Sequence, residues 1–159
     1  MPVKLHEKAF PSGQLKISLV YKDKVVSYYD KPNLVTLAAR QTVLSMMYLA
    51  GRTSDPITTL QVGTGGTIDP LGLFPKPLTK GLTSLYNSVY TTTVSYTTDS
   101  SLPTVTFIAN VPDTDLIGVS INEAGLFTTA GNMFNVKTFP SISKTGDFGI
   151  HIEWTIDFS

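Results

Sequence analysis

The chain has 159 residues, of which 42% are hydrophobic and 15% charged, and its 12 Lys plus Arg balance its 12 Asp plus Glu. This length suits one domain of ordinary size, and a net charge of zero argues against a nucleic-acid binder, which normally presents a basic face. The absence of cysteine excludes disulfides and thiolate metal sites.

Residues 1–13 show no regular period and end in a Pro-Ser-Gly break, so we expect an N-terminal arm that docks on a neighbour or stays loose. No apolar run is long enough for a signal peptide or a membrane-spanning helix. The expectation is therefore a protein made in the cytoplasm of the cell that produces it, with no membrane partner.

Residues 14–159 are expected to form one domain, which begins with a hairpin. Leu15, Ile17 and Leu19 alternate with polar residues in the period of a half-buried strand. A polar turn at 22–24 leads into a second strand, which we expect Pro32 to end.

One helix is predicted, over residues 36–50. Thr36 is placed to cap its start, and Gly51 is placed to end it. Its apolar residues fall at helical spacing and predict a stripe buried against a sheet. The stripe consists of Leu37, Val43, Leu44, Met47 and Ala50.

The remaining chain is typical of strands separated by turns. Strands are expected over 57–62, 82–96, 104–111, 116–128, 133–139 and 148–158. The last of them is the sharpest, because six apolar side chains alternate with polar ones. These six are Phe148, Ile150, Ile152, Trp154, Ile156 and Phe158. Together these patterns predict a mainly β fold, an antiparallel β-sandwich with one amphipathic α-helix packed against it.

The turn Gly63-Thr64-Gly65-Gly66 invites comparison with phosphate-binding loops. It lacks the third glycine of a dinucleotide fingerprint and the Gly-Lys-Ser/Thr of a Walker loop, and no helix is expected to follow it. We interpret it as a backbone turn with positive φ.

Few side chains suggest chemistry. Asp113 and Asp115 are too few for a calcium loop, and the histidines, His6 and His151, have no Ser or Cys partner in a recognisable elbow. Glu123 alternates in step with Ile117, Val119 and Ile121, so a regular strand would direct it inward. It is either a buried catalytic acid or a structural carboxylate bonded to backbone amides. The adjacent Ala-Gly suggests a bulge. We assign no catalytic, cofactor-binding or metal-binding residue, and we expect no cofactor.

The strongest candidate for a partner interface is the segment 67–81. It is too rich in proline for a central strand and too apolar for an ordinary solvated loop. Its apolar residues either form a lid over the open end of the sandwich or contact another subunit. The candidate interface residues are Leu71, Leu73, Phe74, Pro75 and Leu78.

Three stretches, in order, resemble a family of small structural proteins, tail-fibre-like or decoration-like, in the virions of tailed bacteriophages. They are the hairpin that leads into Asn33-Leu34-Val35 and the helix, Ile57 to Gly65, and Ile121-Asn122-Glu123-Ala124-Gly125-Leu126-Phe127 followed by the strand with Trp154. The resemblance covers most of the chain from about residue 14 onward. It implies a non-enzymatic structural protein and transfers no catalytic residue.

The expected function is therefore a structural component of a tail, neck, fibre or capsid surface, acting through homo-oligomeric β-rich interfaces. Its expected partners are further copies and other virion proteins, and its expected location is the virion. The alternative is a carbohydrate-binding or receptor-binding module, in which Tyr86, Tyr90 and Tyr96 stack on a host glycan. A hydrolase is a third hypothesis, which no motif favours.

Overall fold

The computed structural model describes residues 11–48 and 54–159, with the backbone alone at 46–48. This part of the chain contains one helix, α1 (Leu37–Tyr48), and nine strands. The strands are β1 (Ser12–Tyr21), β2 (Val25–Val35), β3 (Ile57–Gly63), β4 (Ser88–Thr93), β5 (Ser95–Thr98), β6 (Thr104–Val111), β7 (Ser120–Thr128), β8 (Met133–Ser143) and β9 (Phe148–Asp157). Their ladders are antiparallel, so the prediction of a mainly β antiparallel fold with one helix is confirmed.

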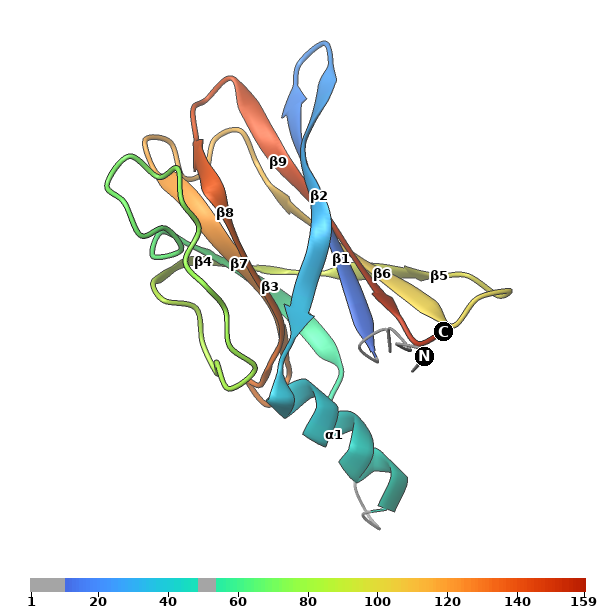
Figure 1. Cartoon of the computed structure of the whole chain (residues 1–159). Coiled ribbons are helices and arrows are strands. Elements are labelled where there is room, and N and C mark those ends of the chain that lie inside the picture. The colour runs from blue at the N-terminus through green and yellow to red at the C-terminus, as the bar shows by residue number, and fades with distance from the viewer. Residues whose placement is uncertain (1–10, 49–53) are drawn as a thin grey trace, which may run out of the picture.

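The strands form one sheet in the order β4-β3-β7-β8-β2-β1-β9-β6-β5, which folds over on itself into a shape close to a barrel (Figure 1). Strand β2 joins the two halves, because it pairs with β1 along most of its length and with β8 only at Leu34–Val136 and Val35–Asn135. The end strands of the order, β4 and β5, are separated in the chain by Val94 alone. The predicted sandwich thus takes the form of one sheet whose halves share a core.

Both halves of the sheet contribute to that core. The inward face of β9 is buried from Phe148 to Ile156, as its alternation predicted, and meets residues of β3 and β7 in one cluster. Trp154 has no exposed surface, and its indole Nε1 donates a hydrogen bond of 2.8 Å to Asn33 Oδ1. A smaller cluster comprises Leu85, Phe127, Met133 and Val136.

The start of α1 agrees with the prediction. The hydroxyl of Thr36 accepts a hydrogen bond from the Ala39 N–H at 3.1 Å and donates one to the Met133 carbonyl at 2.6 Å. Thr36 has no exposed surface, so the cap also attaches the helix to β8.

The predicted apolar stripe of the helix is buried only in part among its described residues, where Val43 packs against the main core. Leu37 and Leu44 are 48% and 56% exposed, whereas the small residues Ala39, Thr42 and Ser45 are buried. Figure 1 shows the reason, since α1 projects beyond the end of the barrel instead of lying across the strands. Ala50, Gly51 and the side chain of Met47 lie outside the described residues.

Several strand boundaries differ from the predictions. Strand β1 begins at Ser12, inside the predicted arm, and residues 1–10 lie outside the described part of the chain. Strand β2 continues through Pro32, because it has a strand partner on one side only at that point. Strand β8 continues through Pro140, which lies opposite the irregularity between Ile121 and Glu123. Residues 82–87 are not a strand, and β4 begins only at Ser88.

Candidate functional site

A buried carboxylate organises the region around the Gly-rich turn. Glu123 in β7 has no exposed surface. Its Oε1 accepts hydrogen bonds from the N–H groups of Gly65 at 3.0 Å and Asn87 at 2.7 Å, and its Oε2 accepts one from Tyr86 at 2.8 Å. Of the two alternatives for Glu123, the structure therefore supports the structural one. The bulge lies just before Glu123 and not at the Ala-Gly that follows it.

The prediction of positive φ in the Gly-rich turn is wrong. The glycines with positive φ in the described chain are Gly72, Gly118 and Gly131. Glycine is needed at 63 and 66 for a different reason, since a Cβ would collide with the carbonyl oxygen of Asn87 at one and of Asn122 at the other. The Gly66 N–H also donates to Asn122 Oδ1 at 2.6 Å. The turn is thus packed tightly against two neighbouring segments.

The turn leads into residues 66–76, which we call the apolar loop. Its tip is held by Asp69, whose carboxylate accepts hydrogen bonds from the N–H groups of Leu73 at 3.0 Å and Phe74 at 2.7 Å. Gly72 has a φ of 71°, a conformation that L side chains rarely adopt. These contacts fix the backbone of the tip.

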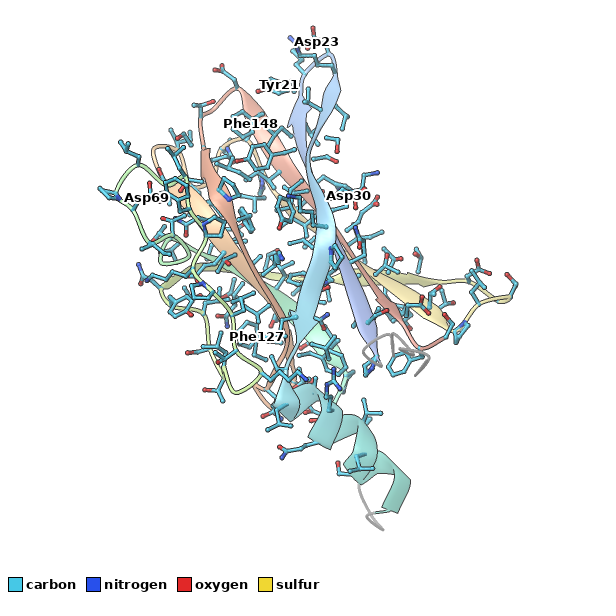
Figure 2. The ribbon with its side chains drawn as sticks, viewed as in Figure 1. Tyr21, Asp23, Asp30, Asp69, Phe127 and Phe148 are labelled. Carbon is cyan, nitrogen blue, oxygen red and sulfur yellow. The ribbon has the colours of Figure 1, made fainter. Side chains whose placement is uncertain are left out.

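The rest of the apolar loop is bonded across itself and to β8. The Ile68 N–H donates to the Phe74 carbonyl at 2.8 Å, and the Lys76 N–H donates to the Gly66 carbonyl at 2.7 Å. The Ser141 N–H of β8 donates to the Gly72 carbonyl at 2.8 Å. The loop is therefore an ordered element, and Figure 2 shows Asp69 at its outer side, away from the sheet.

The apolar loop presents a ridge of exposed apolar side chains. The ridge consists of Ile68, Leu71, Leu73 and Phe74, which are 68%, 79%, 57% and 63% exposed. Of the candidate interface residues, Leu71, Leu73, Phe74 and Pro75 are at the surface. Leu78 is half-buried and packs on the smaller cluster. The packing of Leu78 fits the lid alternative, and contact of the exposed residues with another subunit stays a prediction.

Acid is expected to loosen the tip of the apolar loop. Hydrogen bonds from the backbone of Leu73, and also of Phe74, lower the pKa of Asp69 from its ordinary 3.8. Because the pKa of Asp69 is lower in the folded protein than in the unfolded chain, its ionised carboxylate stabilises the folded loop fully above about pH 3.8. This stabilisation is lost as the pH falls through the pKa that Asp69 has in the folded protein. We expect the amide resonances of Leu73 and Phe74 to shift and exchange faster in this window. Asp69→Asn should abolish the pH dependence, and unchanged amides in the wild type would contradict it.

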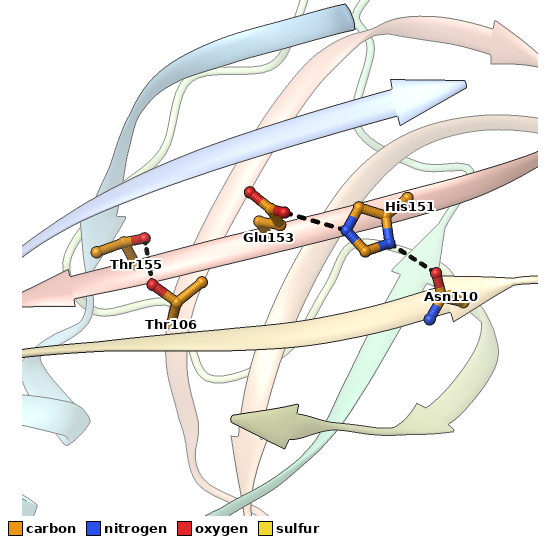
Figure 3. A network of polar contacts seen from close by, with 5 residues as sticks. All are labelled: Thr106, Asn110, His151, Glu153 and Thr155. Atoms are coloured by element: carbon orange, nitrogen blue, oxygen red, sulfur yellow. Dashed lines mark hydrogen bonds and ion pairs between the residues drawn. The ribbon is translucent and has the colours of Figure 1, made fainter. Parts of the chain in front are cut away.

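His151 lies on the polar face of β9 (Figure 3). Its Nδ1 is 2.7 Å from Asn110 Oδ1 and its Nε2 is 3.2 Å from Glu153 Oε1. The neighbouring Thr106 and Thr155 hydroxyls bond to each other at 2.9 Å. In the described part of the chain, the ring nitrogens thus bond to the side-chain amide of Asn110 and the carboxylate of Glu153, and not to a hydroxyl nucleophile. His6 lies outside that part.

The two aspartates considered for a calcium loop, Asp113 and Asp115, lie beside Lys144, a lysine for which the sequence predicted no role. Lys144 is 1% exposed, and its Nζ donates to the carbonyls of Asp113 at 2.9 Å and Thr145 at 2.7 Å. Burial lowers the pKa of Lys144, and the charges of the two aspartates oppose that shift. Lys144 follows directly after β8 and has the parity of the buried Ile142, but the strand is predicted to end at 139, so the sequence pattern does not extend to it.

The three tyrosines of the glycan hypothesis have different surroundings. Tyr86 lies under the ammonium of Lys76, 4.6 Å from its ring centroid, and Tyr96 packs on Phe107. Tyr90 packs against the main core, and its hydroxyl donates to Asp115 Oδ2 at 2.8 Å. Of the three tyrosines proposed to stack on a glycan, Tyr90 is therefore half-buried and not freely exposed at the surface.

Within residues 11–48 and 54–159, no group of three His, Asp or Glu side chains is placed to hold a metal ion. None of the helical residues described there forms a span long and apolar enough to cross a bilayer. No family model, curated protein or solved structure matches the chain.

Proposed function

We propose that the chain is a non-enzymatic structural protein that binds other protein surfaces through the apolar ridge. The observation that carries this proposal is the exposure of four large apolar side chains on a loop whose backbone is already fixed. Scattered apolar residues are ordinary at a surface, but a contiguous group on an ordered loop is typical of an interaction site.

The order of the loop favours tight binding. Binding normally costs free energy because loops and side chains at an interface must be immobilised. Here Asp69 and Ser141 already hold the loop. Leu71 and Phe74 therefore act as anchors that lose surface to water without a large further loss of backbone entropy.

We propose that the occupant of the ridge is a second copy of the chain, and that the assembly belongs to the virion of a tailed bacteriophage. The setting comes from the sequence resemblance. A net charge of zero supports self-association, because little electrostatic repulsion opposes contact between copies. Location at a tail, neck, fibre or capsid surface follows from the same resemblance.

Replacing two anchors is expected to dissociate the assembly without unfolding the protomer. Leu71→Ser with Phe74→Ser removes apolar area at about 25 cal/mol per Å², so the dissociation constant should rise about 100-fold. Sedimentation equilibrium measures this constant. The matched control, Val25→Ser with Leu102→Ser, alters two residues that are 66% and 54% exposed elsewhere, and it should leave the constant unchanged.

Two results would contradict the proposal. One is a wild-type protein that stays monomeric at about 100 μM, a concentration at which an interface of even modest affinity is occupied. The other is an antibody to the chain that fails to label purified particles of a phage whose genome encodes it.

A further inference from the structure

A second surface lies where β2 and β8 separate. The two strands pair at Leu34–Val136 and Val35–Asn135, and from there toward the start of β2 they no longer form a ladder. An open groove of about 470 Å³ lies there, lined by β2, β8 and residues 75–78. Tyr28 bridges the gap at its far end, where its hydroxyl donates to the Pro140 carbonyl at 2.9 Å. The groove is thus bounded at both ends.

One wall of the groove is an unpaired strand edge. Residues 25–33 of β2 pair with β1 on one side. In an antiparallel strand, successive residues direct their backbone N–H and C=O groups to alternate sides. The groups of Asp30 and Pro32, which lie on the same side as the Thr36 N–H that bonds to β8, therefore have no partner strand. Asp30 offers an N–H and a carbonyl, and Pro32 offers its carbonyl alone, because proline has no N–H. These groups are placed to bind the backbone of an added extended segment.

The groove is positively charged. Lys31, Lys76 and Lys137 line it. Lys31 lies opposite Leu15 in the β1–β2 ladder, so its side chain leaves the sheet on the inner face, toward the opening. Among the described residues, the ion pair is His151–Glu153, so these three lysines form no ion pair with a described carboxylate.

The charges of the groove lysines act on each other. Burial lowers the pKa of Lys137, and the positive charge of Lys31 lowers it further. Two ammonium groups that repel each other at a half-buried site are stabilised by an anion between them.

We propose that this groove binds an extended, acidic segment of a partner protein, which adds a strand to the free edge of β2 and places carboxylates beside Lys31 and Lys137. Charge complementarity selects the acidic segment, and the unpaired edge selects an extended backbone. Residues 29–33 cover about 17 Å at about 3.4 Å per residue, so the segment spans about five residues. This surface differs from the apolar ridge, and the proposal does not depend on the proposed function.

The test uses a synthetic seven-residue peptide of alternating threonine and glutamate, titrated into the isotope-labelled full chain. We expect the amide resonances of Tyr29, Asp30, Lys31 and Asn33 in β2 and of residues 137–138 in β8 to shift in the wild type. Lys31→Gln with Lys137→Gln should weaken binding about tenfold, because each surface charge pair contributes a few-fold. The control, Lys16→Gln with Lys22→Gln, makes the same change in net charge outside the groove and should change the affinity less than about twofold.

Two further probes separate strand addition from simple anion binding. A peptide with the same sequence but methylated backbone nitrogens should bind much more weakly, because it cannot donate to β2. A threonine–lysine peptide should not bind. Equal binding of the methylated peptide, equal effects of the two double variants, or the same resonance shifts with inorganic phosphate alone would each overturn the proposal. If a variant fails to fold, the amide resonances of the wild type that shift on addition of the peptide still show whether the peptide binds in the groove.

Discussion

Glu123→Ala is expected to be the most damaging single substitution outside the hydrophobic core. Three backbone N–H groups, of Gly65, Tyr86 and Asn87, lose a charged acceptor at a site with no exposed surface. Hydrogen bonds to charged groups contribute about 1.5 kcal/mol or more each, so the free energy of unfolding should fall by about 4 kcal/mol. Urea unfolding followed by the fluorescence of Trp154 measures this change.

Two further variants make the Glu123 result specific. Glu123→Gln keeps one oxygen but places an NH₂ group against one of the donors, so we expect a loss of about 2–3 kcal/mol. Glu153→Ala removes a half-buried glutamate on the polar face of β9, which contacts His151, and should cost less than about 1 kcal/mol. A Glu123→Gln variant as stable as the wild type would show that the carboxylate is not the essential acceptor.

Trp154→Ala is expected to lower the free energy of unfolding by about 3–5 kcal/mol, or to prevent folding. The side chain is the largest of those with no exposed surface in the described chain, and its removal leaves a cavity between the two halves of the sheet. It also leaves Asn33 Oδ1 without its indole donor. Because the tryptophan is lost, circular dichroism must follow the unfolding.

The Trp154 result can be divided into packing and hydrogen bonding. Trp154→Phe keeps most of the ring volume and loses the bond to Asn33, so it should cost about 2 kcal/mol less than the alanine variant. Tyr96→Ala removes a ring that is 67% exposed and should cost about 1 kcal/mol or less. A loss for Trp154→Ala no larger than for Tyr96→Ala would contradict the central role of Trp154.

Local patterns predicted what depends on neighbours in sequence. The alternation of β9 identified its buried face, and Thr36 was identified as the cap. The proline rule failed at Pro32 and Pro140, because it applies to strands paired on both sides without irregularity. The exposed Leu37 and Leu44 show that apolar spacing in a helix does not determine the angle at which the helix docks.

The candidate sites depended on contacts between distant residues. Glu123 had two readings in the sequence, and the choice required the amides of residues 65, 86 and 87, which lie far from it in the chain. Lys31 and Lys137 are more than a hundred residues apart, so their shared groove has no local pattern. The apolar loop could be singled out by composition, but its order comes from Asp69 and from Ser141 of β8.

The weak junction between β2 and β8 has a mechanical consequence. Within the ladder, the halves of the sheet are linked only by the pairs of Leu34 and Val35. Along the chain, several connections cross between the halves, and the shortest is Val94, whose N–H donates to the Thr58 carbonyl at 3.1 Å. By contrast, β1 and β9 pair continuously from Ser12 to Tyr21. The β2–β8 ladder has the fewest residue pairs of those in the described sheet, so we expect the barrel to open along this line at a lower cost in backbone hydrogen bonds than along any other ladder.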